Sequence, residues 1–155
     1  MKKNVRGIWF FGLSGSGKSY ASNYLKKKIK KSIVIDGDHV RKEVSFDLGY
    51  TIGDRKVQIR RVLGIAKIIL SSNYFPIIST VYFDKTLYKE CSKISILPIK
   101  VIRKDIKNIM KNHKTYINNK KNIVGVDILY PNMKVKNLYN NGELNFCKKL
   151  NFLTK

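Results

Sequence analysis

Apolar runs of strand length alternate with longer amphipathic segments along most of this chain. The apolar runs lie at residues 7–11, 32–35, 75–81, 99–102 and 135–138. Helices are predicted at residues 18–29, 51–72, 105–111 and 144–152, with a short helical turn after residue 38 and a weak helix or loop at 84–93. Strands that alternate with helices predict an α/β fold, in which about five parallel strands form a sheet with helices on both faces.

The segment 51–72 has a clear helical pattern. Thr51 and Asp54 have the spacing of a capping box, which marks a helix N-terminus. Apolar residues then recur at helical spacing, so one face of the helix is predicted to be buried. Arg55, Arg60 and Arg61 lie in the first turns, where positive charge opposes the helix dipole. Two explanations stay open: these arginines bind an anionic ligand, or they are solvated charges.

The most specific motif follows the first predicted strand. Residues 12–19 fit G-x-x-x-x-G-K-[ST] at every position and lead into a predicted helix. Backbone N–H groups of such a loop surround phosphate oxygens, and the helix N-terminus adds partial positive charge. Lys18 is expected to reach the β- and γ-phosphates, and Ser19 to bind Mg²⁺. The residues predicted to bind ATP are Gly12, Leu13, Ser14, Gly15, Ser16, Gly17, Lys18 and Ser19. Together with the strand–helix alternation, the motif predicts a three-layer fold of the P-loop NTPase type.

Two carboxylates follow the second predicted strand. Asp36 and Asp38 flank Gly37 directly after residues 32–35. Ligands of open α/β sheets bind outside the carboxyl ends of the strands, so this pair is expected beside the phosphate loop.

The net charge of +22 over 155 residues has two explanations: an anionic partner, or compositional drift toward lysine, asparagine and isoleucine. The lysines are spread along the whole chain and arginine is scarce, which favours small phosphorylated substrates over a dedicated nucleic-acid surface. We therefore predict no nucleic-acid partner. We also predict no membrane partner, because no apolar window has the length of a transmembrane helix.

The remaining reactive residues suggest no further site. Cys91 and Cys147 lack metal or disulfide spacing, which predicts a cytoplasmic location. His39 and His113 lie far apart in the sequence, so no protein-built transition-metal site is predicted. The length favours a single domain, residues 1–155. Within it, the polar segment at about 113–127 is predicted to be a lid over the site.

The chain resembles the adenylylsulfate kinase family, small P-loop kinases that phosphorylate the 3′-hydroxyl of a nucleotide. The resemblance rests on residues 12–19, 35–41, 47–50 and 54–62, in the right order, and is thin after about residue 81. Weaker similarities follow at Lys114-Thr115-Tyr116 and at residues 124–131, in the positions of the family's substrate lid.

This resemblance implies roles for particular residues. Asp38 would act as the base or orienting group at the acceptor hydroxyl, with Lys18 and Asp36 completing the catalytic set and Asp36 near the metal through water. The residues that would bind the substrate are Asp38, Arg41, Tyr50, Arg55, Gln58, Lys114, Ile123 and Val124. The resemblance also suggests a homodimer.

The departures from the family bear on the acceptor nucleotide. Tyr50 stands where the family has Phe, and Ile123-Val124 stand where a second aromatic residue should complete a sandwich around adenine. Gln58 replaces Asn, and residues 79–84 replace the family's I-S-P-Y-R segment. Residues 79–84 are more similar to the same segment in a divergent branch of the family, whose members phosphorylate cytidine diphosphoramidate in capsule biosynthesis. Adenylylsulfate and cytidine diphosphoramidate therefore both stay open as acceptors.

Two other classes of function compete with a nucleotide 3′-kinase. One is a P-loop kinase of a non-nucleotide metabolite, such as a sugar acid or shikimate. The other is a non-enzymatic nucleotide-binding module with a basic surface for nucleic acid, although the sequence lacks RNP, zinc-finger and helix-turn-helix signatures.

Overall fold

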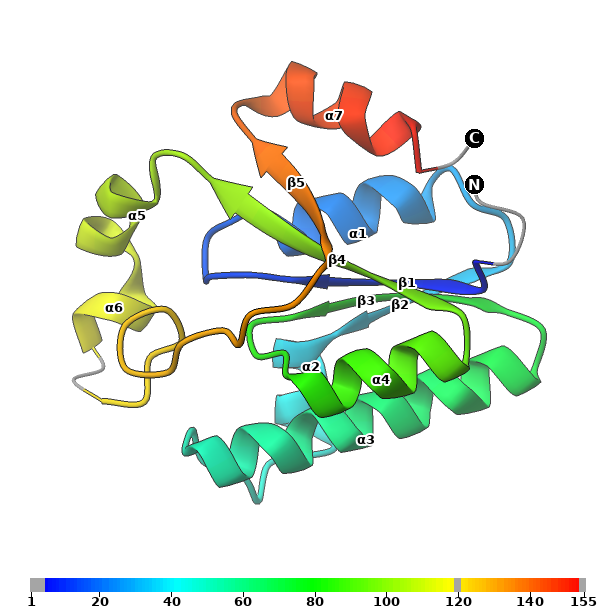
Figure 1. Cartoon of the computed structure of the whole chain (residues 1–155), viewed down its shortest axis with the longest axis horizontal. Coiled ribbons are helices and arrows are strands. Elements are labelled where there is room, and N and C mark those ends of the chain that lie inside the picture. The colour runs from blue at the N-terminus through cyan, green and yellow to red at the C-terminus, as the bar shows by residue number, and fades with distance from the viewer. Residues whose placement is uncertain (1–4, 119–120, 154–155) are drawn as a thin grey trace.

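The computed structural model describes residues 5–118 and 121–153 and confirms the α/β class (Figure 1). Its five strands pair in parallel in the order β2-β3-β1-β4-β5. The strands are β1 (Gly7–Phe11), β2 (Ser32–Asp36), β3 (Phe75–Thr80), β4 (Ile96–Arg103) and β5 (Lys136–Asn140). The helices are α1 (Lys18–Lys26), α2 (Gly37–Glu43), α3 (Ile52–Ser71), α4 (Lys85–Lys93), α5 (Ile106–Asn112), α6 (Lys114–Asn118) and α7 (Glu143–Asn151).

The central strand β1 divides the core into two layers. Successive side chains of a strand point to opposite faces of the sheet. Ile8 and Phe10 pack in the cluster that includes residues of α1 and α7, whereas Trp9 and Phe11 pack in the cluster that includes residues of α3 and α4. Figure 1 shows the same arrangement, with α1 and α7 over one face of the sheet and α3 and α4 over the other. The predicted three-layer architecture is therefore confirmed.

Most predicted elements have nearly the expected bounds, and the differences have local causes. Helix α1 ends at Lys26 rather than near residue 29, because the N–H groups of Lys28 and Ile29 turn back to the carbonyl of Leu25. The segment 84–93 is a regular helix, since Asp84 caps its start by accepting a hydrogen bond from the N–H of Leu87.

Two further differences lie in the second half of the chain. Strand β4 begins at Ile96 and is longer than predicted, because it pairs with β1 along the full length of that strand. The predicted lid contains a short helix, α6, although its sequence lacks helical periodicity. Residues 119 and 120 of that lid lie outside the described residues.

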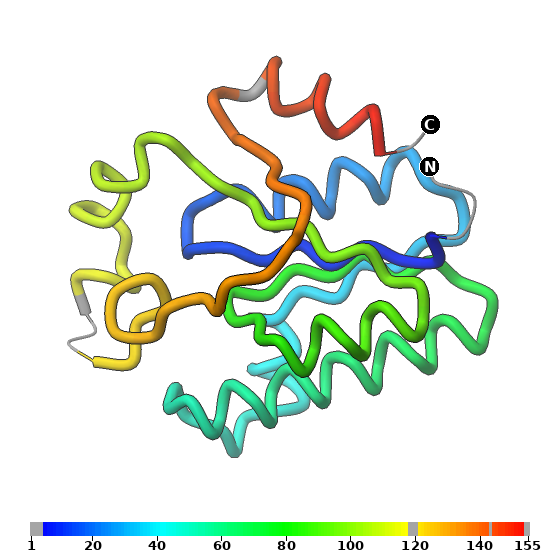
Figure 2. The backbone as a smooth tube through the Cα atoms, in the orientation of Figure 1, coloured from blue at the N-terminus to red at the C-terminus, as the bar shows by residue number. Residues whose placement is uncertain are grey.

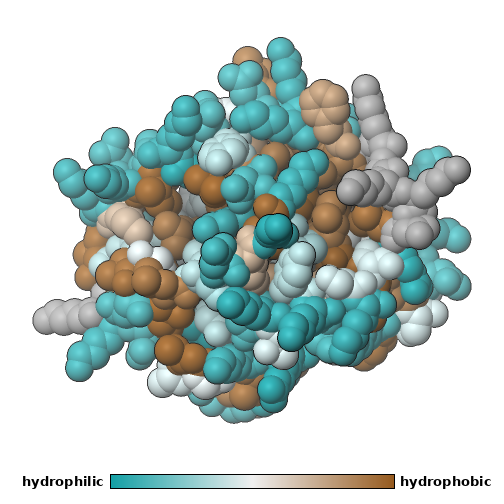
Figure 3. Space-filling model, viewed as in Figure 1, coloured by the Kyte–Doolittle hydropathy of each residue, from teal (hydrophilic) through white to brown (hydrophobic). Residues whose placement is uncertain are grey.

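The carboxyl ends of the strands open toward α5 and α6 (Figure 2). From residue 121 the chain returns along this end of the sheet and enters β5. In the view of Figure 3, hydrophilic side chains are dispersed over the visible face, with apolar ones between them. None of the described helices is long and apolar enough to cross a bilayer.

Candidate active site

The phosphate loop joins β1 to α1 at the carboxyl end of the sheet. A Cβ atom on Gly12 would run into the carbonyl of Val101, so a larger residue does not fit there. Gly17 caps the start of α1 with φ of 100°, in the left-handed region that L side chains rarely adopt. These two positions explain why the loop requires glycine, and they direct the N-terminus of α1 toward the site.

Side chains hold the carbonyls of this loop, and most of these side chains come from outside the sequence motif. Four consecutive carbonyl groups each accept a hydrogen bond from a side chain, and three of the four donors come from the second half of the chain. The bonds are Lys18 Nζ to Leu13 O at 2.8 Å, Tyr116 Oη to Ser14 O at 3.2 Å, Arg103 Nη1 to Gly15 O at 3.5 Å and Asn140 Nδ2 to Ser16 O at 3.0 Å. The carbonyls are thereby engaged, and so is the N–H of Ser16, which donates to the carbonyl of Leu13 at 3.2 Å.

Two buried groups fit a phosphate at this loop. Within the described residues, the Ser16 hydroxyl is buried and makes no hydrogen bond. Lys18 is only 8% exposed, and burial lowers its pKa to about 8 although Asp38 and Asp36 act in the opposite direction. A buried cation and an unpaired buried hydroxyl are unfavourable until they meet a partner, and a triphosphate supplies one.

Asp36 lies where a Mg²⁺ ion beside the phosphates would be held. Its Oδ2 accepts hydrogen bonds from the hydroxyls of Ser19 and Ser79, each at 2.8 Å, and its Oδ1 accepts one from the N–H of Asp38 at 3.0 Å. Desolvation raises the pKa of Asp36, but these hydrogen bonds outweigh it and the net shift is downward, so the carboxylate is ionised.

A hydroxyl and an ionised carboxylate suit Mg²⁺, which keeps several waters and takes few protein ligands. Among residues 5–118 and 121–153, no three His, Cys, Asp or Glu residues are placed to form a complete cage. The residues present therefore fit a magnesium ion that is shared with ATP phosphates, with Ser19 as direct ligand and Asp36 acting through water.

Asp38 lies in the first turn of α2 and lines the same cavity as the phosphate loop. Its side chain is exposed to this cavity, while its backbone N–H is held by Asp36. The charge of Asp38 is also close enough to Lys18 to raise the pKa of that ammonium group against the effect of burial. The predicted acceptor base is thus placed next to the donor loop.

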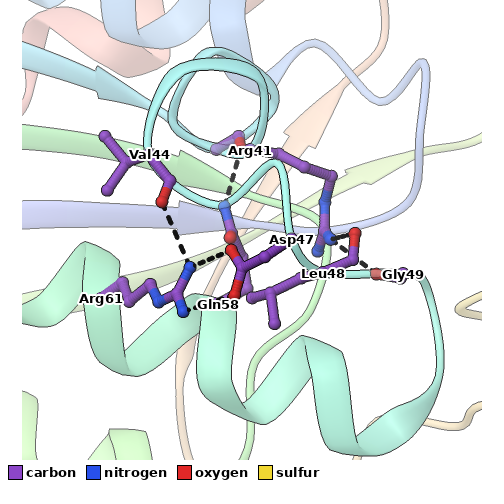
Figure 4. A network of polar contacts seen from close by, with 8 residues as sticks. Arg41, Val44, Asp47, Leu48, Gly49, Gln58 and Arg61 are labelled. Carbon is purple, nitrogen blue, oxygen red and sulfur yellow. Dashed lines mark hydrogen bonds and ion pairs between the residues drawn. The ribbon is translucent and has the colours of Figure 1, made fainter.

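Arg41 and Arg55 share the ring of Tyr50 on the other side of the cavity. The guanidinium carbons lie 4.8 Å and 5.6 Å from the ring centroid. Arg41 also donates to the carbonyls of Leu48 at 3.3 Å and Gly49 at 2.6 Å, which fixes the loop before Tyr50 (Figure 4). Two cations at one aromatic ring form a positive, stacking-competent surface that suits a nucleotide.

Arg55 connects this surface to the predicted lid. It donates to the carbonyl of Tyr50 at 3.1 Å and to that of Asn122 at 2.8 Å. Burial lowers the pKa of Arg55, and the nearby charge of Arg41 lowers it further. Ile123 and Val124 follow Asn122 and line the cavity with aliphatic side chains. These side chains stand where the family resemblance led us to expect the second aromatic ring.

Gln58 supports the turn that carries the carboxylates. Its Nε2 donates to the carbonyl of Gly37 at 3.1 Å, which places the amide next to the Asp36–Asp38 segment. Gln58 is 5% exposed and lines the cavity, and its Oε1 has no hydrogen-bond partner among the described residues. The residue is thus placed both to position Asp38 and to face a substrate.

Lys114 is a predicted substrate-binding residue that does not line the cavity, and Gly12, Leu13 and Ser16 of the phosphate loop do not line it either. Lys114 is exposed on α6, whereas its neighbours His113 and Thr115 line the cavity. Its proposed substrate contact therefore requires movement of the lid. Tyr82, in the segment 79–84, and Lys121, in the predicted lid, also line the cavity, although neither was predicted as a site residue.

The donor and acceptor groups meet in one cavity of about 530 Å³. The phosphate loop, the Asp36–Asp38 segment, the Tyr50 surface and the lid residues all line it. A phosphate loop at the carboxyl end of the central strand, in a parallel sheet of this order, defines a P-loop nucleotide-binding fold.

Residues 5–143 match the model of the family described as adenylylsulphate kinase. The adenylyl-sulfate kinase of Clostridium acetobutylicum is 35% identical over 144 residues, which cover 84% of this chain and 71% of that protein. The chain belongs to the adenylylsulphate kinase family.

Other curated relatives match over shorter stretches. The probable adenylyl-sulfate kinase of Bacillus subtilis is 44% identical over 69 residues, 42% of this chain and 35% of that protein. The bifunctional enzyme NodQ of Rhizobium sp. strain N33 is 41% identical over 76 residues, 46% of this chain and 12% of that protein. The matched stretches thus cover well under half of these two relatives.

A solved structure shares the fold over nearly the whole chain. The APS kinase CysC of Mycobacterium tuberculosis, in complex with AMPPNP and APS, superposes with a TM-score of 0.78 at 20% identity, covering 97% of this chain and 95% of that chain. This similarity confirms the predicted P-loop fold.

An ion pair between Arg61 and Asp47 holds the segment before Tyr50. The sequence had left the role of Arg61 open. Arg61 on α3 donates to both carboxylate oxygens of Asp47, at 2.5 Å and 2.8 Å, and to the carbonyl of Val44 at 3.2 Å (Figure 4). The pair is partly exposed, so its contribution to global stability is small. Its bidentate geometry instead fixes the position of the loop.

We expect Arg61→Ala to raise the KM for the acceptor by roughly 5-fold, the size of a modest positioning effect, with the KM for ATP unchanged. Steady-state kinetics with each substrate varied would measure both constants. The matched control is Arg60→Ala, at an exposed position next to it on α3. Equal effects of the two substitutions would contradict a positioning role for Arg61.

Proposed function

We propose that this protein is an ATP-dependent kinase that transfers the γ-phosphoryl group of MgATP to the ribose 3′-hydroxyl of a nucleotide. The single observation that supports this proposal best is the shared cavity, in which a phosphate loop faces a carboxylate and two arginines at an aromatic ring. Phosphoryl transfer depends mainly on positioning and on charge neutralisation, and these groups suffice for both.

The donor half would bind the triphosphate through the backbone N–H groups of residues 12–17 and the ammonium group of Lys18. Mg²⁺, held by Ser19 and through water by Asp36, would neutralise charge on the phosphates. Desolvated Lys18 gains a strong partner when the phosphates enter, so its interaction with them is stronger than that of an exposed lysine.

The acceptor half would place the 3′-hydroxyl next to Asp38. The 3′-oxygen forms a bond to the γ-phosphorus as the bond from that phosphorus to the β–γ bridging oxygen breaks, and ADP leaves. Asp38 accepts or orients the proton that the hydroxyl loses. Arg41 and Arg55 would bind the acceptor phosphate, because a planar guanidinium matches phosphate oxygens better than an ammonium does.

Two nucleotides fit this acceptor half. Adenylylsulfate is the acceptor named in the family to which the chain belongs. Cytidine diphosphoramidate is the alternative, supported by the similarity of residues 79–84 to the branch of the family that phosphorylates it. Ile123 and Val124, which stand where the second aromatic face for adenine is expected, leave the base open. Loss of one stacking face would remove about 1–3 kcal/mol of base binding, enough to change the preferred base.

An ATP-consumption assay over a panel of acceptors tests this proposal. Adenylylsulfate and cytidine diphosphoramidate represent the nucleotide class, while shikimate and gluconate represent the metabolite class. We expect turnover with one of the nucleotides and none with the other class. Activity with shikimate or gluconate alone would contradict the proposal and would indicate a kinase of a non-nucleotide metabolite.

We expect Arg41→Ala to weaken acceptor binding by roughly 10- to 100-fold, as loss of hydrogen bonds from a charged group would, while ATP binding changes little. Arg41→Lys should not restore affinity, because lysine lacks the planar fork that contacts both the loop carbonyls and the ring of Tyr50. Titration calorimetry with acceptor and with ATP analogue separates the two effects. Lys42→Ala, exposed on the same helix, is the control.

Several broader predictions stay open. A nucleic-acid-binding module would show oligonucleotide affinity that falls steeply and linearly with the logarithm of salt concentration. The cytoplasmic location, the single domain and the homodimer likewise remain predictions, and sedimentation would determine the last.

A further inference from the structure

His113 occupies the junction between α5 and α6, at the rim of the donor half of the cavity. Its backbone N–H closes α5 by donating to the carbonyl of Ile109 at 2.8 Å. Its ring packs edge-on to Tyr116, with centroids 5.8 Å apart. The sequence alone suggested no role for this residue beyond the absence of a metal site.

The ring of His113 has a defined orientation. Its Nδ1 accepts a hydrogen bond from the backbone N–H of Thr115 at 3.3 Å, so a neutral ring carries its proton on Nε2. The Cδ2–Nε2 edge faces the phosphate loop: these two atoms lie 3.4 Å and 3.9 Å from where a Cβ of Gly15 would stand. A hydrogen-bond donor is therefore presented beside the loop.

Among the described residues that line the lid side of the cavity, the other cationic side chain is that of Lys121. The sequence contains no arginine after Arg103, and Arg103 itself binds Asp105 and the carbonyl of Gly15. Arg41 and Arg55 belong to the acceptor side, and Lys121 is exposed. Phosphoryl transfer requires charge neutralisation around the transferred group, and the donor phosphates are otherwise contacted from the loop side only.

We propose that His113 binds the donor nucleotide, with its Nε2–H donating to a phosphate oxygen held over Gly15. The proposal rests on the proposed function, since it needs a triphosphate in the loop. The imidazole donates from Nε2 whether neutral or protonated, so the contact does not require a change of charge. His113 thereby supplies a phosphate contact from the junction of α5 and α6.

Nitrogen-15 NMR of the imidazole groups tests this directly, because the chain contains only two histidines. Mg-AMPPNP is added to the wild-type protein, and a His39→Ala variant assigns the two signals. His39 is exposed on α2 and does not line the cavity, which makes it the internal control. We expect the Nε2 signal of His113 to shift on nucleotide binding and that of His39 to stay in place.

Kinetics provide the second readout. His113→Ala should raise the KM for ATP by about 10-fold, the lower end for a lost hydrogen bond to a charged group, and leave the KM for the acceptor unchanged. His113→Gln should recover part of the loss through its amide donor, whereas His39→Ala should change neither constant. An unshifted His113 signal with calorimetrically verified AMPPNP binding would overturn this inference alone. Absence of any AMPPNP binding to the wild type would overturn the proposed function with it.

Discussion

Replacing Lys18 with methionine is expected to lower kcat by at least about 10²–10³-fold, because an interaction aimed at the phosphoryl charge is lost. Methionine fills a similar volume without the charge, so the loop remains packed. Steady-state ATP consumption measures the effect. Lys30→Met, at an exposed position after α1, should retain full activity. Substantial turnover by the Lys18→Met variant would remove Lys18 from the donor site.

The same substitution is expected to stabilise the ligand-free protein. Burial lowers the pKa of Lys18 to about 8 from an ordinary value of 10.5, so the folded protein holds this charge at a cost on the order of 3 kcal/mol. Between about pH 8 and pH 10.5 the unfolded chain binds more protons at this site, so the wild type gains stability as pH rises through that window.

Denaturant unfolding at pH 7 and at pH 10 would measure this effect. The stabilisation by Lys18→Met should be largest below pH 8 and should shrink toward pH 10.5. A variant that is less stable than the wild type at pH 7 would show that the hydrogen bond from Lys18 to the carbonyl of Leu13 outweighs the cost of burying the charge.

Asp38→Asn is the second change with a large expected effect. Asparagine keeps the shape of the side chain but cannot accept the proton of the hydroxyl, so kcat should fall by about 100-fold or more. The affinity for ATP should change little, because the loop carries the triphosphate and the backbone N–H of Asp38 still holds Asp36.

Single-turnover kinetics with saturating ATP would isolate the chemical step for this variant. Glu43→Gln, an exposed position on the same helix, is the matched control and should behave as the wild type. An unchanged kcat in Asp38→Asn would exclude this carboxylate from the chemistry and would leave it a role only in binding.

Much of the fold follows from local patterns in the sequence. The strand Gly7–Phe11, the loop at 12–19 and the capping box at Thr51 are all encoded within a few residues, and each has the predicted place in the structure. The length of β4 could not be predicted, because it depends on pairing with β1 rather than on an uninterrupted apolar run. Helix α6 likewise lacks an amphipathic pattern of its own.

The candidate site divides in the same way. The motif points to Lys18 and Ser19, and the family resemblance points to Asp38 and Arg55; all four line the cavity, and their roles stay predictions. The side chains that hold the loop carbonyls come from distant parts of the chain, and neither Arg103 nor Asn140 belongs to a recognisable pattern. Such contacts arise only when the sheet brings the ends of β1, β4 and β5 together.

The acceptor half shows what the arginines on α3 do. Arg55 is buried, lines the cavity and joins Tyr50 to the lid, whereas Arg61 pairs with Asp47 in the loop before Tyr50 and does not line the cavity. Arg60 is exposed and fits the alternative explanation. The proposed choice between two acceptors concerns this half of the cavity, which carries the departures from the family at Tyr50 and Gln58.

The most direct test of a nucleotide 3′-kinase is phosphorus NMR of the product. The acceptor that supports ATP consumption is converted to completion, and phosphorus–proton correlation locates the new phosphate ester. We predict an ester on C3′ of the ribose, and no product from the corresponding 3′-deoxynucleotide. An ester at any other position, or ATP consumption by neither nucleotide acceptor, would contradict the account.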